Sequence, residues 1–170
     1  MTNSRTQSGH DAGLARSRYI LNTDGGIVAA ANQPEGEAAM GVLITSEDGH
    51  EVARASARLG WQQDHHVAEF NALVFGLTLV RQLGIDNLEI RTDSELVHRT
   101  VKGEWKLRPD HLRKLRDQAV ELWELAGRPT IDWVPRKQNS LADGLAGEVL
   151  GPLRPKPSTL AHIIERESPG

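Results

Sequence analysis

Four carboxylates lie in apolar surroundings along the chain. They are Asp24 in YILNTDGG, Glu69 in HHVAEFNALVFGL, Asp93 in LEIRTDSELV and Asp143 in NSLADGLAGEVL. Carboxylates that come close together repel and raise one another's pKa values unless cations lie between them. Oxygen ligands in that number suit Mg²⁺ or Mn²⁺. If the fold gathers these four side chains, the sequence predicts a divalent-metal site.

Each of the four acids also has an ordinary structural explanation. An Asp-Gly step between two β-like runs favours a hairpin turn at Asp24. Asp93 can cap the helix that follows it, and Asp143 can close a capping box with Ser140. Glu69 can lie at the solvent edge of its helix. Each explanation is adequate for one residue, but all four together are a weaker account than one shared site.

The length and composition exclude several classes of protein. The chain has 170 residues, enough for one ordinary domain with its own core, and no cysteine for a disulfide or a thiol nucleophile. It has no long apolar run and no signal-like start, so we expect a soluble, cytoplasmic protein. The net charge of −3 argues against nucleic-acid binding by the whole surface.

Hydrophobic periodicity predicts a domain with alternating β and α segments. We expect strands over residues 18–31, 39–45, 51–59, 87–92 and 129–134, and helices over residues 66–83, 93–102, 108–126 and 140–150. The order is βββαβααβα. Helical crossovers make the first, fourth and fifth strands parallel. The predicted fold is an α/β, mixed five-stranded sheet with helices on both faces.

The two ends of the chain differ from the part between them. Residues 1–17 are polar and small, and we expect a disordered tail. Residues 151–170 are rich in proline and form a C-terminal tail, in which the segment TLAHIIERE can form a short helix. The single folded domain therefore covers residues 18–150.

The predicted elements carry the four acids toward one edge of the sheet. Asp24 lies on the first strand, Asp93 follows the fourth, and Asp143 lies in the first turn of the last helix. Glu69 lies on the intervening helix, where small residues three and seven positions further on allow close approach to the sheet. Ligand sites in open α/β sheets form outside the carboxyl ends of parallel strands, where these acids are expected to converge.

A basic stretch over residues 99–116 contrasts with the acidic remainder of the chain. It holds seven basic residues against two acidic ones, with Trp105 between Lys102 and Lys106. Taken alone, the pattern is typical of a solvated helix face with one core tryptophan.

Five short motifs occur in a fixed order over residues 18–150. They are D-G at 24–25, A-E-x-x-A-L at 68–73, T-D-S-x-x-V at 92–97, K-G-E-W-K at 102–106 and W-V-P-R-x-x-N-x-x-A-D-x-L-A at 133–146. Each motif is weak alone, but all five in order are specific. With these motifs the sequence resembles the type I ribonuclease H family, in the compact form without the basic protrusion.

The resemblance implies a catalytic mechanism and its cofactors. It makes Asp24, Glu69, Asp93 and Asp143 the catalytic residues and the ligands of two Mg²⁺ ions, for which Mn²⁺ can substitute. Asp24 would bridge the two ions, Asp143 would help to hold the ion that activates water, and the other two acids would serve the second ion. The implied reaction is internal hydrolysis of the RNA strand of an RNA–DNA hybrid, leaving 5′-phosphate and 3′-hydroxyl ends.

We expect a monomer that does not bind membranes. The resemblance also implies how this protein would hold the hybrid. The implied substrate-binding residues are Gly25, Gly26, Lys102, Trp105, Lys106 and Arg136. Backbone amides at the two glycines would meet the 2′-hydroxyls that distinguish RNA from DNA. The basic stretch would follow the phosphates of the DNA strand while the indole packs on a sugar.

The sequence departs from the family pattern in two places. Many members have paired asparagines or threonine–asparagine just before the A-E motif, where this chain has His65 and His66. We interpret both as loop residues rather than metal ligands, because imidazole is a poor match for Mg²⁺. Many members also carry a histidine in the loop before the last helix, and residues 135–138 contain none.

Two other functions stay open at this point. One is a non-catalytic RNA- or hybrid-binding module on the same fold, since a fold alone does not determine function. The other is a related 3′–5′ exonuclease, which shows D-x-E on its first strand, where this chain has Gly26. A small-molecule hydrolase is not supported, because the sequence has neither a G-x-S-x-G motif nor a P-loop.

Overall fold

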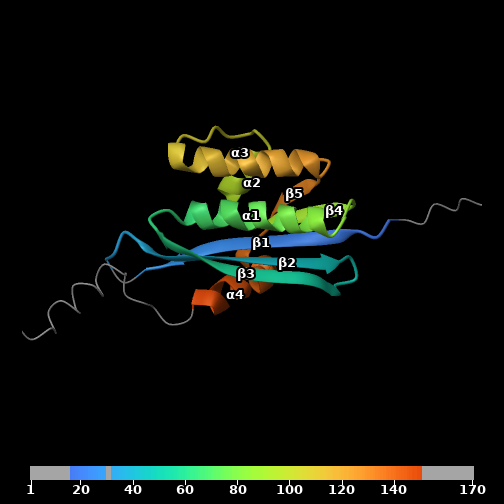
Figure 1. Cartoon of the computed structure of the whole chain (residues 1–170), viewed down its shortest axis with the longest axis horizontal. Helices are drawn as coiled ribbons and strands as arrows, with labels where there is room; N and C mark the ends of the chain where they lie inside the picture. The colour runs from blue at the N-terminus through green and yellow to red at the C-terminus, as the bar shows by residue number, and fades with distance from the viewer. Residues whose placement is uncertain (1–15, 30–31, 151–170) are drawn as a thin grey trace, which may run out of the picture.

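A computed structural model describes residues 16–29 and 32–150, which form one mixed sheet covered by helices (Figure 1). The strands are β1 (Tyr19–Val28), β2 (Gly36–Ser46), β3 (Glu51–Gln62), β4 (Leu88–Thr92) and β5 (Thr130–Trp133). Their order in the sheet is β3-β2-β1-β4-β5. The first three strands pair antiparallel, whereas β4 pairs parallel with β1 and with β5. The predicted sheet is therefore confirmed.

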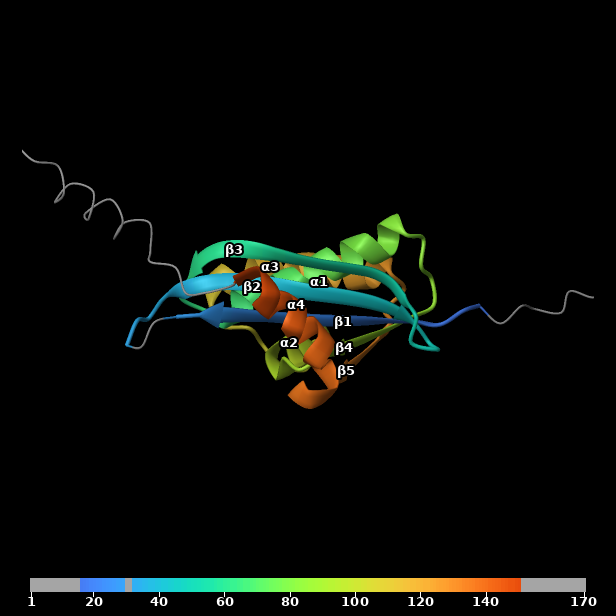
Figure 2. The same ribbon diagram turned by 90° about the horizontal axis from the view of Figure 1, so that it is seen from below.

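Helices cover both faces of this sheet, as predicted. They are α1 (His65–Gln82), α2 (Glu95–Val101), α3 (Asp110–Leu125), the 3₁₀ helix η1 (Arg136–Asn139) and α4 (Ser140–Leu150). α1 packs on β1 and β2, and α3 packs on α1 as an outer layer (Figure 1). α4 lies across β1 and β2 on the opposite face (Figure 2).

The main core lies between the sheet and α1. Leu21 on β1, Ile44 on β2 and Ile90 on β4 are fully buried there, opposite Phe70 and Leu73 of α1. Full burial of one such side chain contributes about 1.5–3 kcal/mol. These residues come from the segments whose periodicity predicts strands and a helix, and this agreement explains why the fold class follows from sequence.

The ends of α1 have local signals. Asp64 caps the first turn, since its carboxylate accepts a hydrogen bond of 3.0 Å from the His66 amide. Gly84 follows the last turn with φ of +67°, a conformation that favours glycine. The capped helix begins at His65, one residue before its predicted start.

Several element boundaries differ from the predicted ones. β1 ends at Val28, and residues 30–31 of its predicted range lie outside the described part of the chain. β2 begins at Gly36 and β3 continues to Gln62, because these extensions pair with each other although residues 36–38 are weak β-formers. The predicted loop over 135–139 contains the 3₁₀ helix η1.

The predicted tails lie almost entirely outside the described residues, and so does the TLAHIIERE segment. No helix in the described ranges is long and apolar enough to cross a bilayer.

α4 touches the sheet through backbone atoms at Gly41. A Cβ atom on this residue would lie 2.2 Å from the carbonyl oxygen of Ala142 and 2.7 Å from the amide nitrogen of Ala146. Cβ atoms essentially never approach backbone atoms so closely. The absence of a side chain at Gly41 therefore determines how closely α4 packs on β2.

Gly41→Ala is expected to lower the free energy of unfolding by about 1–3 kcal/mol, because α4 must move away from the sheet. Gly147→Ala makes the same chemical change on α4, where a Cβ atom would meet no other atom within 4 Å. It is expected to stabilise the protein by about 0.5–1 kcal/mol through helix propensity. Urea denaturation of both variants measures the difference, and equal effects would contradict the packing argument.

Candidate active site

The register of the two central parallel strands places Asp24 beside Asp93. Thr23 on β1 is paired with Thr92 on β4, and each threonine is followed directly by one of the acids. Both threonines are buried, and they form the last pair of the parallel segment, so the two acids lie directly beyond its end. This is the carboxyl edge at which the sequence predicts a ligand site.

Asp143 approaches the same place from α4. Asp24 is paired across the sheet with Gly41, against which the backbone of Ala142 packs. Asp143 is the next residue of α4, and its charge acts on the Asp24 carboxyl. The structure thus brings Asp24, Asp93 and Asp143 together.

The pKa of Asp24 is raised from 3.8 to about 8. Burial is the largest cause, followed by the charge of Asp93, a hydrogen bond between the two carboxyls, and the charge of Asp143. The backbone amide of Gly25 acts in the opposite direction. Asp24 is part of a continuous strand, so the hairpin-turn explanation for this residue is wrong.

Glu69 reaches this region from the other face of the sheet, over Gly25. A Cβ atom on Gly25 would lie 2.2 Å from the carbonyl carbon of Ala68 and 2.4 Å from the Glu69 amide nitrogen. The Glu69 carboxylate accepts a hydrogen bond from the Ser94 hydroxyl and one of 2.7 Å from His66 Nδ1. Its side chain is only 13% exposed, which excludes the solvent-edge explanation.

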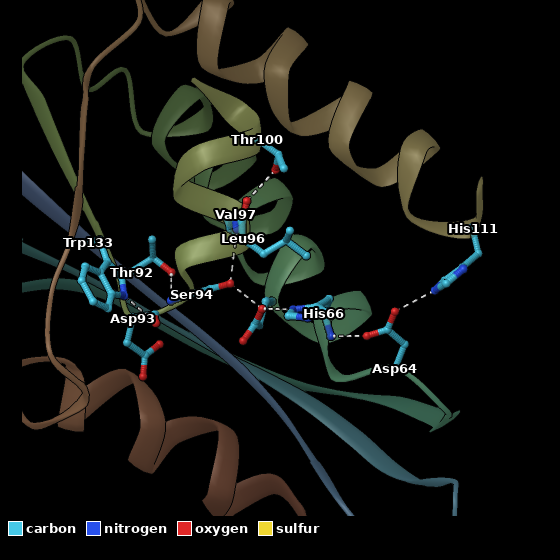
Figure 3. A network of polar contacts seen from close by, with 11 residues as sticks. Asp64, His66, Thr92, Asp93, Ser94, Leu96, Val97, Thr100, His111 and Trp133 are labelled. Atoms are coloured by element: carbon cyan, nitrogen blue, oxygen red, sulfur yellow. Dashed lines mark hydrogen bonds and ion pairs between the residues drawn. The ribbon is translucent and has the colours of Figure 1, made fainter. Parts of the chain in front are cut away.

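Ser94, and not Asp93, caps α2. Its hydroxyl oxygen accepts a hydrogen bond from the Val97 amide at 3.3 Å, and α2 begins at Glu95 (Figure 3). The predicted helix start at Asp93 and the capping explanation for that residue are therefore wrong. The Asp93 carboxyl does not cap the helix and instead lies with Asp24 and Asp143 in what we call the acid cluster. The backbone carbonyl of Asp93 accepts a hydrogen bond from the Trp133 indole (Figure 3).

Asn139 is a site residue that sequence reasoning missed. It is 1% exposed, and its amide nitrogen donates to the Thr23 carbonyl at 2.9 Å and to Asp93 Oδ1 at 3.4 Å. One side chain therefore joins β1, at the last residue that pairs with β4, to the acid that follows β4. The asparagine in the last motif was a signal, but only the fold shows which acid it contacts.

Asp143 is paired with Arg136. The guanidinium donates to Asp143 Oδ1 at 2.8 Å, and this contact is the main cause that raises the pKa of Arg136. Asp24 and Asp93 raise the pKa of Arg136 further, so its positive charge faces all three acids. Arg136 lies at the edge of the acid cluster rather than apart from it.

Similarity to known proteins agrees with this geometry. Residues 22–149 match the family described as reverse transcriptase-like. The ribonuclease HI of Halobacterium salinarum is 36% identical over 115 residues, which cover 68% of this chain and 57% of that protein. The bifunctional protein Rv2228c of Mycobacterium tuberculosis is 30% identical over 155 residues, covering 89% of this chain and 42% of that protein.

Solved structures show the same relationship. The RNase H1 of Halobacterium salinarum NRC-1 has a TM-score of 0.70 at 34% identity, over 78% of this chain and 97% of that one. The N-terminal RNase H domain of Rv2228c, solved as a fusion with maltose-binding protein, has a TM-score of 0.70 at 30% identity, over 78% and 98%. The chain belongs to the type I ribonuclease H family. It spans about half the length of the curated relatives that it matches.

The basic stretch of this ribonuclease H homologue is only partly a helix face, because residues 102–109 form the loop between α2 and α3. Trp105 is 45% exposed in the loop between α2 and α3, so the core-tryptophan explanation is wrong. The Arg99 guanidinium lies 5.9 Å from the indole centroid, and Lys102 pairs with Glu104 at 2.8 Å. Trp105 and Lys106 line an open hollow of about 590 Å³. The surface combines an exposed ring with accessible cations.

The interpretation of His65 and His66 as loop residues is wrong. His65 and His66 are the first residues of α1, and His66 contacts Glu69 directly. The signal that could have corrected this is Asp64, a capping residue immediately before them.

The donor set fits Mg²⁺ or Mn²⁺, because the carboxylates of Asp24, Asp93 and Asp143, and that of Glu69, whose backbone lies over Gly25, are hard oxygen ligands. A cation placed among them would also relieve the repulsion that raises the pKa of Asp24. Glu69 and Asp143 are instead engaged by His66 and Arg136. Within the described ranges, a different group, Asp64, His65 and His66, has ligand atoms within 4.8 Å of one another.

The raised pKa of Asp24 predicts that its ionisation destabilises the metal-free fold. Between about pH 4 and pH 8 the folded protein holds a proton that the unfolded chain has lost, so this contribution to stability falls as pH rises. In EDTA, Asp24→Asn is expected to be more stable than the unmodified protein by about 1–3 kcal/mol at pH 9. The difference should shrink toward pH 4. Denaturant melts at both pH values measure it, and a pH-independent difference would contradict the assigned pKa.

Proposed function

We propose that this protein is a metal-dependent endoribonuclease that hydrolyses the RNA strand of RNA–DNA hybrids. The observation that carries the proposal is the gathering of Asp24, Asp93 and Asp143 at the carboxyl edge of β1 and β4, with Glu69 arriving over Gly25. Family membership supports it. So does a relative, LC11-RNase H1, which was solved in complex with an RNA/DNA hybrid and shares 30% identity at a TM-score of 0.68.

In this proposal Asp24, Glu69, Asp93 and Asp143 hold two Mg²⁺ or Mn²⁺ ions. When bound, such a pair lowers the pKa of the attacking water and stabilises the leaving 3′ oxygen, which leaves 5′-phosphate and 3′-hydroxyl ends. Asp24 must give up the proton that its pKa of about 8 retains at neutral pH.

The surrounding residues orient these ligands. Ser94 and His66 hold the Glu69 carboxylate, and Asn139 holds Asp93 next to Thr23 of β1. Arg136 offsets part of the charge of Asp143 and can exchange this carboxylate for a substrate phosphate.

For substrate contacts the structure favours Gly26 over Gly25. Gly25 is covered by the backbone of α1, and its amide supports the Asp24 carboxylate. A Cβ atom on Gly26 would meet nothing within 4 Å, so a ribose 2′-hydroxyl has room to approach there. The loop with Lys102, Trp105 and Lys106 supplies phosphate contacts and an exposed ring for a sugar.

The alternatives predict different products. A non-catalytic module would bind a hybrid without cutting it, and a 3′–5′ exonuclease would release nucleotides from one end. Four carboxylates within an otherwise buried framework favour catalysis, because such a cluster is costly to keep without a cation to bind.

The unmodified protein is expected to cut the RNA strand of an end-labelled hybrid at internal positions with Mg²⁺ or Mn²⁺, and to stop in EDTA. Asp24→Asn should reduce the rate by more than about 100-fold, because it removes a proposed metal ligand. Asp132→Asn, an exposed position on β5, is the matched control and should keep the rate. Equal cutting of RNA or DNA duplexes, or activity unchanged by EDTA, would overturn the proposal.

Replacing Lys102 and Lys106 together with alanine is expected to weaken hybrid binding and flatten its salt dependence. Each lost phosphate contact should reduce the slope of log K against log salt by about 0.9. Replacing Arg54 and Arg81, two exposed cations elsewhere, is the control. Fluorescence anisotropy with a labelled hybrid measures the slopes. If both double variants keep the original slope, the loop does not contact the phosphates.

A further inference from the structure

A second group of possible metal ligands lies at the start of α1, outside the acid cluster. One ligand atom from each of Asp64, His65 and His66 falls within 4.8 Å of the others. The two imidazole rings lie side by side, with centroids 4.0 Å apart. None of these three residues belongs to the set proposed to hold Mg²⁺.

We propose that Asp64, His65 and His66 form a binding site for a divalent transition metal of the Zn²⁺ type. Two imidazoles and one carboxylate are typical ligands of Zn²⁺ and a poor match for Mg²⁺. Zn²⁺ bonds of about 2.0–2.2 Å require ligand atoms within about 4.2 Å of one another, so small side-chain rotations close the site. Water completes the coordination.

Hydrogen bonds already prepare two of these ligands. His66 donates from Nδ1 to Glu69 at 2.7 Å, which leaves Nε2 with its lone pair for a metal. The Glu69 carboxylate is fixed in turn by Ser94. A carboxylate behind a metal-binding histidine is the usual arrangement in protein zinc sites, because it fixes the tautomer and strengthens the ligand.

Asp64 has a similar support from a different helix. His111, near the start of α3, lies with its Nε2 atom 2.8 Å from Asp64 Oδ2. Figure 3 shows Asp64 between His66 and His111. His111 is therefore a positioning residue for the carboxylate, and the site joins the beginnings of α1 and α3.

The site is accessible and close to the acid cluster. His65 is exposed, and Asp64 and His66 are partly exposed, so a hydrated cation can reach them from solvent. The hydrogen bond between Glu69 and His66 links the proposed Mg²⁺ ligands to the proposed Zn²⁺ ligands. The two sets differ in ligand chemistry. Oxygen ligands on one side and imidazoles on the other would select different metals.

Isothermal titration calorimetry of the full chain, without an affinity tag, tests this inference with ZnCl₂ as the probe. His65→Ala removes an exposed ligand, and Asp64→Asn removes the carboxylate while keeping a good helix cap. Each is expected to weaken Zn²⁺ binding by at least about tenfold, and His111→Ala by about tenfold. Circular dichroism of the metal-free variants verifies that each one folds.

Two controls separate this site from other sources of Zn²⁺ binding. His50→Ala removes an exposed histidine that pairs with Asp48 at 2.7 Å but has no third ligand among the residues that the structure describes, and it should keep the affinity. Asp24→Asn disturbs the acid cluster and should also keep it. The inference is overturned if His65→Ala and Asp64→Asn bind Zn²⁺ like the unmodified protein, or if Asp24→Asn abolishes binding while His65→Ala does not.

Discussion

Direct contact between helix backbone and sheet backbone on both sides of Asp24 is the constraint on which this site depends. At Gly25 the backbone of α1 covers one face of β1, and at Gly41, the partner of Asp24, the backbone of α4 covers the opposite face. Any Cβ atom at either position would overlap the helix. Because both glycines lack one, Glu69 and Asp143 approach the same short stretch of β1 from opposite faces of the sheet.

The negative charge gathered in this way is balanced unevenly. The Glu69 carboxylate accepts hydrogen bonds from His66 and Ser94, and the Asp143 carboxylate accepts one from Arg136. Asp24 is buried beside two other acids, and its pKa rises to about 8. Functional sites commonly contain a titratable group whose ionised form is destabilised in the ligand-free fold. Such sites lose stability in exchange for ligand binding.

The start of α1 connects two kinds of ligand chemistry. His66 lies between Asp64, which caps the helix, and Glu69, which is proposed to bind metal with the other acids. Oxygen ligands gather on the Glu69 side, and imidazoles gather on the Asp64 side, where His111 also arrives from α3. The proposed ligand chemistry at the start of α1 thus differs from that of the acids, although both lie on the same helix.

The sequence by itself determined the order of the elements and their direction in the sheet, and it predicted that Asp24, Asp93 and Asp143 come together. These features depend on local periodicity and on crossover rules, and both can be read along the chain. The fully buried Phe70 and Leu73 and the alternation in β3 agree with the periods that predicted them. Boundaries were less exact where pairing partners extended strands such as β2.

Only the tertiary structure decided which polar group serves which acid. Sequence could not distinguish Asp93 from Ser94 as the cap of α2, because both are good capping residues and the choice depends on where β4 ends. It could not join Asn139 to Asp93, 46 residues away, or place Trp105 in solvent. Such contacts link segments distant along the chain. Their partners are therefore determined by strand register and by the close approach of helices at glycine, and not by local pattern.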